Sequence, residues 1–372
     1  MYKKILVTGG AGFIGSHLVD GLIKKKYQVR ILDNLTEQIH PGRKKPAYLN
    51  KKAEFIFGDV TNKQDVLKSL KGVDAVFHLA AAVGVGQSMY EIAHYSKVNC
   101  YGTGLLLEAI ANAKKQIKKI VVAASMSSYG EGLYRCVTCG IVQPSLRLEE
   151  KLSNKDFNNY CPSCGRKIIP VPTDEEAKQN SNSVYAINKK DQEQMVLVVG
   201  KAYDIPSIAL RYFNVYGPRQ SLSNPYNGVA AIFMSRIKNS KPPIINEDGL
   251  QTRDFIHVKD VTQANIAALE TDSGNYESYN VGSGIPVTIK EVAHTLARLQ
   301  GSSVKPELTQ KCRKLDVRHC YADIKKINKK LGWKPTISFE NGMKQVVNWA
   351  KDEEAIDRVD VAMQELLSRG LR

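Results

Sequence analysis

The feature that most constrains this chain is a glycine-rich run, VTGGAGFIG, which begins at residue 7 directly after a short apolar stretch. Gly10, Gly12 and Gly15 match the spacing G-x-G-x-x-G, and Gly9 adds a further glycine before them. Glycines at this spacing let the backbone approach a pyrophosphate closely, and the following helix then points its amino terminus at the phosphates. The run therefore predicts the strand, turn and helix of a dinucleotide-binding fold.

Apolar β-branched runs alternate with helical patterns along the first part of the chain. The expected strands lie at 3–8, 28–33, 54–59, 74–80, 119–125 and 205–214. The expected helices lie at 13–26, 64–72, 90–115 and 183–202. Strands that alternate with helices predict an α/β class with a doubly wound parallel sheet that is covered on both faces. From about residue 224 the alternation becomes irregular, which predicts a smaller C-terminal lobe.

Asp33 ends the second expected strand, 18 residues after Gly15. A carboxylate at this place accepts hydrogen bonds from ribose hydroxyls and repels a 2′-phosphate, so it favours NAD over NADP. Arg43 and Lys44 are the nearby basic residues that weaken this inference. The sequence therefore predicts NAD as the cofactor.

Four of the seven cysteines form two C-x-x-C pairs, each followed by glycine: Cys136 with Cys139, and Cys161 with Cys164. The pairs are separated by 21 residues, a pattern typical of a zinc ribbon. Two disulfides are the alternative, which a cytoplasmic protein disfavours. Because four thiolates leave no open coordination position, we expect the zinc to be structural.

The charge and hydropathy of the chain limit its partners. The 53 Lys and Arg residues against 37 Asp and Glu give a net charge of +16, but the lysines occur in short runs spread along the chain, as on a solvated surface. No nucleic-acid-binding motif accompanies them. No apolar run approaches the roughly 20 residues of a membrane span, and the amino terminus has no signal-peptide core. We therefore expect a cytoplasmic protein that binds neither nucleic acid nor membrane.

Four further segments resemble the extended short-chain dehydrogenase/reductase family, and within it the nucleotide-sugar epimerases. They are HLAA at 78–81, VNCYGT at 98–103, the Y-x-x-x-K of Tyr185 and Lys189, and Ser125 four residues before a Tyr-Gly pair. The resemblance spans nearly the whole chain apart from the cysteine segment. This segment lies between Ser125 and Tyr185, which are 60 residues apart in the sequence. It implies that Ser125, Tyr185 and Lys189 are catalytic.

The chemistry of Tyr185 and Lys189 suits that role. Residues four apart are neighbours on one helical face. Ionising a tyrosine at pH 7 costs about 4 kcal/mol, and one cation about 4 Å away supplies roughly that much at an effective dielectric near 20. We therefore expect Lys189, aided by a positive nicotinamide ring, to let Tyr185 take a proton from a sugar hydroxyl to which Ser125 is hydrogen-bonded.

The resemblance also implies the binding residues. Expected cofactor contacts are Gly9, Gly10, Gly12, Phe13, Ile14, Gly15, Asp33, Asn34, Asp59, Val60, Leu79, Ala80, Ala81, Asn99, Tyr185 and Lys189. Expected substrate contacts are Ser88, Ser127, Asn214, Arg253, Arg313 and Cys320. Asn214, Arg253 and Arg313 match family positions that face the diphosphate, and two arginine forks suit an anion of this kind.

Sugar 4,6-dehydratases resemble the chain too, but they need an acid and a base beside the catalytic hydroxyl. Here the equivalent run is Ser125-Met126-Ser127, which has no carboxylate. The segments 81–95 and 316–324 are most similar to dTDP-L-rhamnose 4-epimerases, which interconvert dTDP-L-rhamnose and dTDP-6-deoxy-L-talose. Alternatives are a UDP-glucose or UDP-glucuronate 4-epimerase, although Cys320 stands where galactose-type enzymes carry a tyrosine. An alternative of another class is a non-enzymatic NAD-sensing regulator that binds nucleic acid.

These observations predict four segments and one assembly. We expect residues 1–133 to form the NAD-binding Rossmann part, 134–169 a zinc-ribbon insertion, 170–223 the continuation of the Rossmann part with the catalytic helix, and 224–372 mainly a substrate-binding lobe. The substrate is expected to be a nucleotide-diphosphate sugar. We also expect a homodimer.

Overall fold

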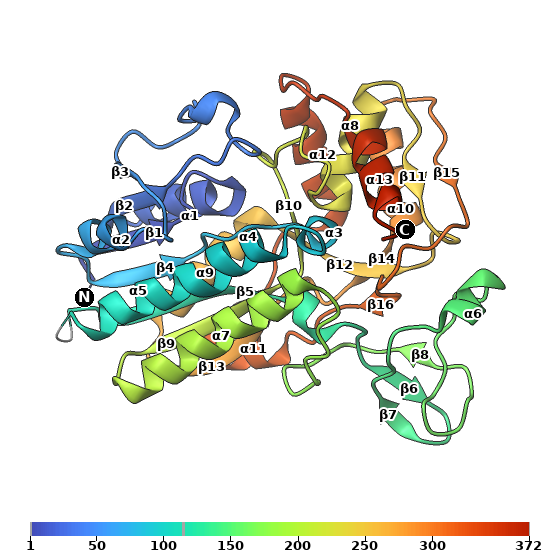
Figure 1. The fold of residues 1–372 in the computed structure, drawn as a ribbon, viewed down its shortest axis with the longest axis horizontal. Coiled ribbons are helices and arrows are strands. Elements are labelled where there is room, and N and C mark those ends of the chain that lie inside the picture. The colour runs from blue at the N-terminus through green and yellow to red at the C-terminus, as the bar shows by residue number, and fades with distance from the viewer. Residues whose placement is uncertain (1, 114–115, 372) are drawn as a thin grey trace.

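A seven-stranded parallel sheet forms the centre of the protein, for which the computed structural model describes residues 2–113 and 116–371 (Figure 1). Its order is β13-β9-β5-β4-β1-β2-β3. The strands are β1 (Lys4–Thr8), β2 (Gln28–Asp33), β3 (Glu54–Phe57), β4 (Ala75–His78), β5 (Lys119–Ser125), β9 (Ser207–Tyr212) and β13 (Glu277–Val281). This confirms the predicted parallel Rossmann sheet, and β13 adds a strand from the C-terminal part of the chain.

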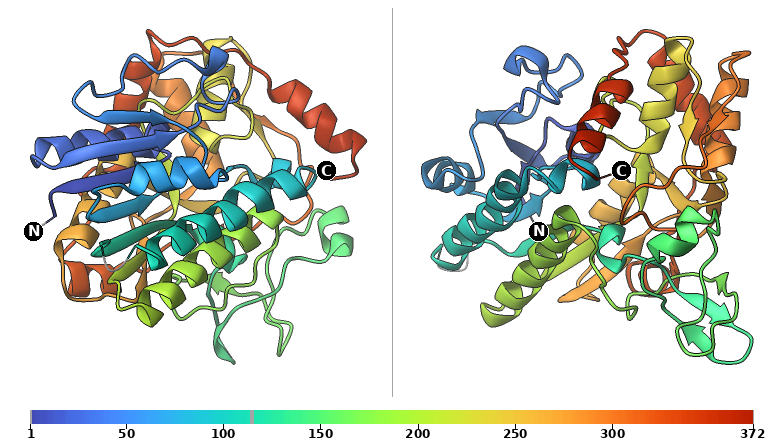
Figure 2. Two further views of the ribbon diagram at one scale, coloured as in Figure 1. Left: turned by 60° about the vertical axis from the view of Figure 1, so that its left-hand side comes forward. Right: turned by 45° about the vertical axis from the view of Figure 1, so that its right-hand side comes forward.

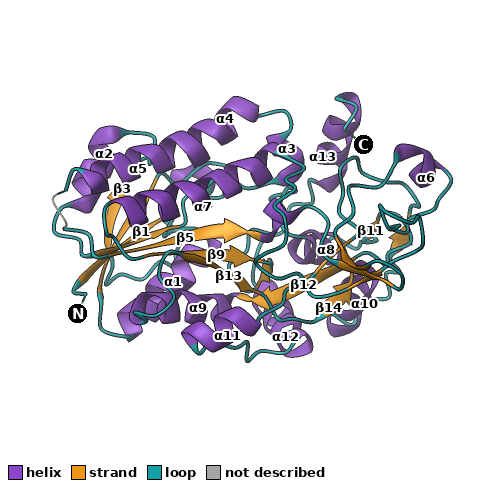
Figure 3. Cartoon of the chain, turned by 90° about the horizontal axis from the view of Figure 1, so that it is seen from below, coloured by secondary structure: helices purple, strands orange, loops and turns teal. Residues whose placement is uncertain are grey.

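Helices cover both faces of this sheet, as Figure 3 shows from below. One face carries α2 (Lys63–Leu70), α4 (Ile92–Ser96), α5 (Gly102–Ala111) and α7 (Val184–Ala202). The other carries α1 (Phe13–Lys24), α9 (Val258–Glu270) and α11 (Lys325–Leu331). Strands buried on both sides are continuously apolar, which is why the sequence shows β-branched runs rather than alternation. The helix expected at 90–115 is divided by a π-helical turn at Lys97–Tyr101, and its last two residues lie outside the described ones.

The smaller lobe is built on a sheet of β10 (Asn214–Tyr216), β12 (Thr252–His257), β14 (Pro286–Thr288) and β16 (His319–Cys320). A two-stranded sheet of β11 (Ile244–Ile245) and β15 (Glu307–Leu308) lies with it. Its helices are α8 (Val229–Lys238), α10 (Ile289–Leu299), α12 (Phe339–Ala350) and α13 (Val359–Ser368). Phe233, Leu296 and Met343 are among the residues of its separate apolar core. None of the described helices is both long and apolar enough to cross a membrane.

The boundary between the two parts is not a single point in the chain. Although α9 and β13 come after residue 224, they complete the Rossmann layers. Gly21 of α1 allows this packing, because a Cβ at Gly21 would lie 2.7 Å from the Thr262 side chain of α9. The range 224–372 therefore supplies elements to both parts.

The cysteine segment projects from the side of the body, as both views of Figure 2 show in green. It contains a three-stranded antiparallel sheet of β6 (Tyr134–Cys136), β7 (Gly140–Val142) and β8 (Ile169–Pro170). The short helix α6 (Glu149–Ser153) lies between β7 and β8 in the sequence. Its own small core contains the buried side chains of Tyr134 and Ile168. We call residues 134–169 the insert.

Candidate functional site

The glycine loop after β1 leaves no room for side chains at two places. A Cβ at Gly9, whose φ is +68°, would lie 2.9 Å from the backbone of Ala80. A Cβ at Gly15 would overlap the carbonyl oxygen of Gly9. Gly12 is the N-cap of α1 and has no side-chain cap, so the first amides of the helix are available to an anion. The loop therefore fits the pyrophosphate of a dinucleotide.

Asp33 stands at the carboxyl end of β2 and shapes the same loop. One of its oxygens accepts the amide of Ala11 at 2.9 Å, and the other accepts the amide of Leu35 at 2.9 Å. Each carboxylate oxygen keeps a further lone pair for a ribose hydroxyl. Nearby, the Asn34 side chain donates to Asp59 at 2.8 Å. This arrangement fits NAD.

The other expected cofactor contacts follow the carboxyl ends of neighbouring strands. Phe13 and Ile14 form the first turn of α1, Val60 follows β3, and the run 79–81 follows β4. Asn99 differs from them, because its side chain binds both backbone groups of Ala82. It holds the loop after β4 in place and is itself fully buried.

The three expected catalytic residues come from two adjacent elements. Ser125 is the last residue of β5, and its hydroxyl accepts hydrogen bonds from the amide and the hydroxyl of Ser127, at 3.2 and 2.8 Å. Tyr185 lies in the first turn of α7 and Lys189 one turn later. The Lys189 ammonium donates to the carbonyl of Ala123 in β5 at 2.7 Å. This bond fixes the catalytic helix against the strand that carries Ser125.

Burial controls the pKa of both ionisable groups. It raises the pKa of Tyr185 to about 12, and a hydrogen bond with Ser125 offsets part of the rise. Burial also lowers the pKa of Lys189 to about 7, against a smaller opposite effect of Cys100. In the protein without ligands, Tyr185 is therefore the neutral phenol at pH 7. The reason is desolvation, which acts against the charged form of both groups.

A buried polar network supports these elements from behind. His78 at the end of β4 contacts Thr8 of β1 at 2.8 Å and Thr103 of α5 at 2.9 Å, and Gln192 of α7 donates to Thr103. Burial lowers the pKa of His78 to about 3, so the ring is neutral. The network ties two strands and two helices together at the site, a role that the sequence did not reveal.

The two arginines expected at the diphosphate converge on one carboxylate. Arg253 of β12 contacts one oxygen of Asp316 at 3.1 Å, and Arg313 contacts the other oxygen at 3.1 Å. The side chain of Arg253 is 13% exposed and that of Arg313 is 49% exposed, so both can still reach a ligand. We call Arg253, Arg313 and Asp316 the clamp. Asp316 was not predicted, although the spacing Arg313-x-x-Asp316 was visible.

The remaining expected substrate contacts are placed differently from one another. The fully buried Ser88 donates to the carbonyl of Val85 and accepts the amide of Tyr185 at 3.1 Å, so its hydroxyl helps to position the catalytic helix. Cys320 is also buried and lies 3.9 Å from Thr173. By contrast, the side-chain oxygen of Asn214 is buried without a hydrogen-bond partner among the described residues. It is therefore available to a ligand.

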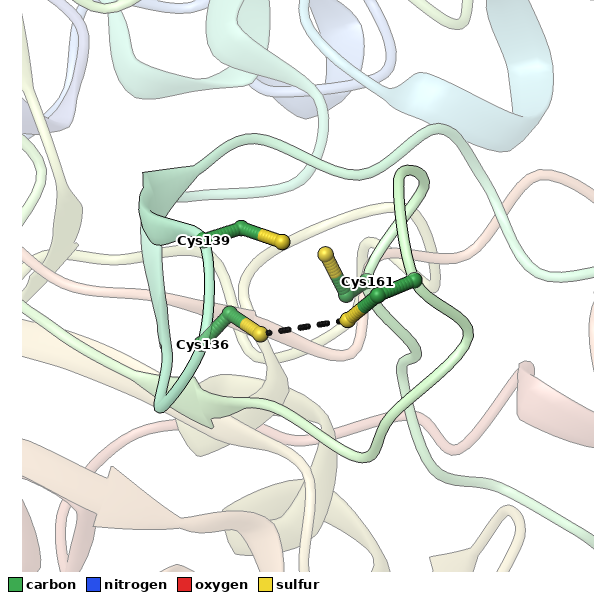
Figure 4. A group of neighbouring side chains, drawn as sticks. Cys136, Cys139 and Cys161 are labelled. Atoms are coloured by element: carbon green, nitrogen blue, oxygen red, sulfur yellow. Dashed lines mark hydrogen bonds between the residues drawn. The ribbon is translucent and has the colours of Figure 1, made fainter.

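The four cysteine sulfurs of the insert lie within 4.8 Å of one another (Figure 4). Cys136 and Cys164 are 3.5 Å apart. Sulfurs at about 2.3 Å from one tetrahedral zinc ion are themselves about 3.7 Å apart, so the spacing suits such an ion. Among the His, Cys, Asp and Glu side chains of the described residues, these four cysteines are the one group whose ligand atoms lie close enough together to hold a metal ion.

Backbone amides in the insert favour the thiolate at two of the four cysteines, whereas contacts with the neighbouring sulfurs of Cys164 and Cys161 raise the pKa of Cys139 to about 12. The amide of Arg166 lowers the pKa of Cys164, but burial and the Cys136 sulfur outweigh it, so this pKa is raised too. Burial alone would raise the pKa of Cys161, but the amides of Cys164 and Ser163 donate to its sulfur and lower the pKa to about 6. The amides of Cys139 and Thr138 lower the pKa of Cys136 in the same way. Thiolates are the form that binds metal. The cluster therefore has both the geometry and the chemistry of a metal site.

Comparisons with known proteins agree with this geometry. The profile of the NAD dependent epimerase/dehydratase family matches residues 5–145, and that of GDP-mannose 4,6 dehydratase matches residues 167–346. The chain is 34% identical to the dTDP-L-rhamnose 4-epimerase of Burkholderia thailandensis, over 94% of this chain and 96% of the relative. Residues 146–166, which neither profile matches, fall within the insert.

Two solved structures share the fold over almost their whole length. The UDP-glucose 4-epimerase of Thermotoga maritima with UDP-glucose has a TM-score of 0.77 and 32% identity, covering 94% of this chain and 98% of that one. The UDP-glucuronic acid 4-epimerase of Bacillus cereus, in complex with UDP-glucuronic acid and NAD, has a TM-score of 0.75 and 29% identity, covering 94% and 99%. The chain therefore belongs to the NAD-dependent epimerase/dehydratase family of extended short-chain dehydrogenase/reductases, as an NAD-dependent enzyme of the nucleotide-sugar 4-epimerase type.

Proposed function

We propose that this enzyme interconverts dTDP-L-rhamnose and dTDP-6-deoxy-L-talose by inverting carbon 4. The observation that carries the proposal is a complete Ser125, Tyr185 and Lys189 set without an acid or base at residues 126 and 127. A 4-epimerisation by transient oxidation needs no further acid or base, whereas water elimination does. The 34% identity to the dTDP-L-rhamnose 4-epimerase over nearly the full length supports the choice of sugar.

In the proposed reaction Tyr185 takes the proton of the sugar 4-hydroxyl, and Ser125 donates a hydrogen bond to the same oxygen. Bound NAD supplies the acceptor, and then the donor, of the hydride at carbon 4. Burial alone raises the pKa of Tyr185, and in the proposal the positive charge of Lys189 stabilises the ionised form of this tyrosine. After the 4-keto sugar has rotated and its opposite face has received the hydride, Tyr185 returns its proton to the oxygen at carbon 4.

The sugar must turn while its nucleotide stays bound. In the proposal Arg253 and Arg313 hold the diphosphate throughout, and the side chain of Asn214 faces the same group. Arg313 keeps free donors beside its contacts with Asp316. The terminal nitrogens of Arg253 already donate four hydrogen bonds, so in the proposal Arg253 exchanges some of them for the diphosphate. The sugar then rotates about the diphosphate and presents its opposite face to the same catalytic residues.

A UDP-glucose or UDP-glucuronate 4-epimerase is the second candidate, which the similarity to the Thermotoga and Bacillus structures favours. Cys320 supports the first candidate, since a buried thiol packed with Tyr129 and Phe213 makes a different surface from the tyrosine of galactose-type enzymes. A nucleic-acid-binding regulator is disfavoured, because it would have no use for the catalytic set.

The test is incubation of the purified enzyme with dTDP-L-rhamnose, UDP-glucose and UDP-glucuronate, with products read by NMR. We expect conversion of dTDP-L-rhamnose without added NAD, and deuterium at carbon 4 should remain on carbon 4. Conversion of the UDP-sugars alone would establish the second candidate. Loss of the deuterium to water would contradict the oxidation mechanism in either case.

We further propose that the insert binds one structural zinc ion through Cys136, Cys139, Cys161 and Cys164. The compact group of four sulfurs supports this. We also propose a homodimer. Ile187 and Val198 of α7 are 47% and 67% exposed. Because they are eleven residues apart, they lie on the same face of the helix, and in the proposal a second copy of the chain covers this face.

A further inference from the structure

A buried ion pair joins the insert to the smaller lobe. Arg147, in the loop between β7 and α6, donates two hydrogen bonds to Glu247, at 2.9 and 2.8 Å. The two side chains are 3% and 2% exposed, although they are 100 residues apart in sequence. A bidentate pair of this kind fixes orientation as well as distance. The insert is therefore held to the lobe in a defined geometry.

The same guanidinium also touches the clamp. Arg147 donates to the backbone carbonyl of Asp316 at 3.1 Å and, on the insert side, to the carbonyl of Phe157 at 3.3 Å. From the other direction, Arg253 donates to the carbonyls of Val317 and Arg318. The peptide from 316 to 318 thus lies between Arg147 and Arg253. A shift of Arg147 would move the carboxylate that holds both clamp arginines.

A second connection starts at the cysteine cluster. Tyr134 packs in one small core with Cys136 and Cys161, and its hydroxyl donates to the buried Glu131 at 2.8 Å. Glu131 in turn accepts the backbone amide of Arg318 at 2.6 Å. Figure 1 shows the insert beside β16, which begins directly after residues 316–318. The packing of Tyr134 and its hydrogen bond to Glu131 therefore join the metal-binding core to the Arg318 peptide, whose carbonyl accepts a hydrogen bond from Arg253 of the clamp.

We propose that Arg147 is a positioning residue through which the metal-bound insert sets the geometry of the clamp, so that metal binding and nucleotide-diphosphate binding favour each other. The inference rests on the proposed function, because it assigns the clamp to a diphosphate. The four cysteines order the loops that carry Tyr134 and Arg147. Without the metal these loops lose their main constraint, and the 316–318 peptide loses its contacts from that side.

The test compares Arg147→Met with Arg135→Met. Arg147→Met leaves Glu247 paired with Arg318 at 2.7 Å, so no buried carboxylate loses its last cation. Arg135 is exposed in β6 of the same insert, and no hydrogen bond or ion pair of its side chain is found among the described residues. Arg147→Lys keeps the charge without the bidentate contact. Thermal unfolding and NAD content show which variants remain folded.

Binding of free dTDP, measured by calorimetry on the full-length protein, is the main readout. We expect Arg147→Met to weaken dTDP binding about tenfold, within the usual range of coupling between sites. Arg147→Lys should lie between it and the wild type, and Arg135→Met should match the wild type. In turnover, KM should rise while kcat at saturation changes less than about twofold, since Arg147 does not touch the reacting atoms.

Removal of the metal by a chelator completes the test. We expect it to weaken dTDP binding to the wild type about as much as Arg147→Met does, and to have little further effect on that variant. Unchanged dTDP affinity in Arg147→Met or in the metal-free wild type would overturn the proposed coupling and leave the proposed function intact. A folded wild type that binds neither dTDP nor UDP would overturn both.

Discussion

Replacement of Lys189 by methionine should stabilise the protein at neutral pH while it removes most of the activity. The pKa of Lys189 is lowered from 10.5 to about 7, chiefly by burial. In the unfolded chain the lysine recovers its ordinary pKa, so the unfolded state binds more protons between these two values. Protonation therefore favours unfolding, and this destabilisation is fully present below about pH 7 and absent above about pH 10.5.

The size of the effect follows from the shift. At about 1.4 kcal/mol per pKa unit, the lowered pKa corresponds to a destabilisation of about 4 kcal/mol at pH 7 and about 1 kcal/mol at pH 10. Methionine removes this term but also the hydrogen bond to the carbonyl of Ala123, which costs about 1–2 kcal/mol. We expect a net gain of about 2–3 kcal/mol at pH 7 that disappears by pH 10.

Urea unfolding of wild type and Lys189→Met at pH 7 and pH 10, with matched NAD content, measures the difference. Lys201→Met is the control, because Lys201 is exposed near the end of the same helix. Turnover of the Lys189 variant should fall at least 100-fold, since Tyr185 loses the cation that favours its ionised form. A variant no more stable than the wild type at pH 7, or a gain equal at both pH values, would refute the reasoning.

Three further outcomes follow from the site. Asp33→Arg should weaken NAD binding, because the ribose acceptor is lost and a cation replaces it; cofactor released on denaturation measures this, and NADP in the wild type would contradict it. Metal analysis should find one zinc ion per chain in the wild type and none in Cys136→Ser, whereas the control variant Cys312→Ser should retain its zinc. A zinc-free wild type purified without chelators would refute the assignment. Tyr185→Phe should lower kcat about 1000-fold with little change in dTDP affinity, and a variant with near-normal kcat would exclude Tyr185 as the acid and base.

The Rossmann half could be predicted from the sequence because its determinants are local. Gly9 and Gly15 are needed by the turn itself, and Asp33 follows from the end of the adjacent strand. Strands β1, β2, β4 and β5 are apolar runs because both faces are buried, so their positions could be read to within a few residues. Likewise, the spacing of the four cysteines predicted a cluster that the structure forms.

Long-range contacts could not be predicted in this way. The division of the expected helix 90–115 by a π-helical turn, and the return of α9 and β13 to the Rossmann layers, depend on packing against distant elements. Ser88 and Asn99 were assigned to ligands from their place in family segments. In the structure their side chains hold the backbone of Tyr185 and Ala82, a function that is defined only once the chain has folded.

The sequence by itself determined the identity of the reactive groups, because the chemistry of a phenol, an ammonium, an arginine or a thiol is carried by the residue and its local spacing. Only the tertiary structure decided how those groups behave. Burial, which depends on the whole fold, moves the pKa of Tyr185 up and that of Lys189 down. Packing also brings Arg147 to Glu247 across 100 residues, and so links the insert to the clamp. Desolvation and long-range pairing are properties of the folded chain, and no local pattern encodes them.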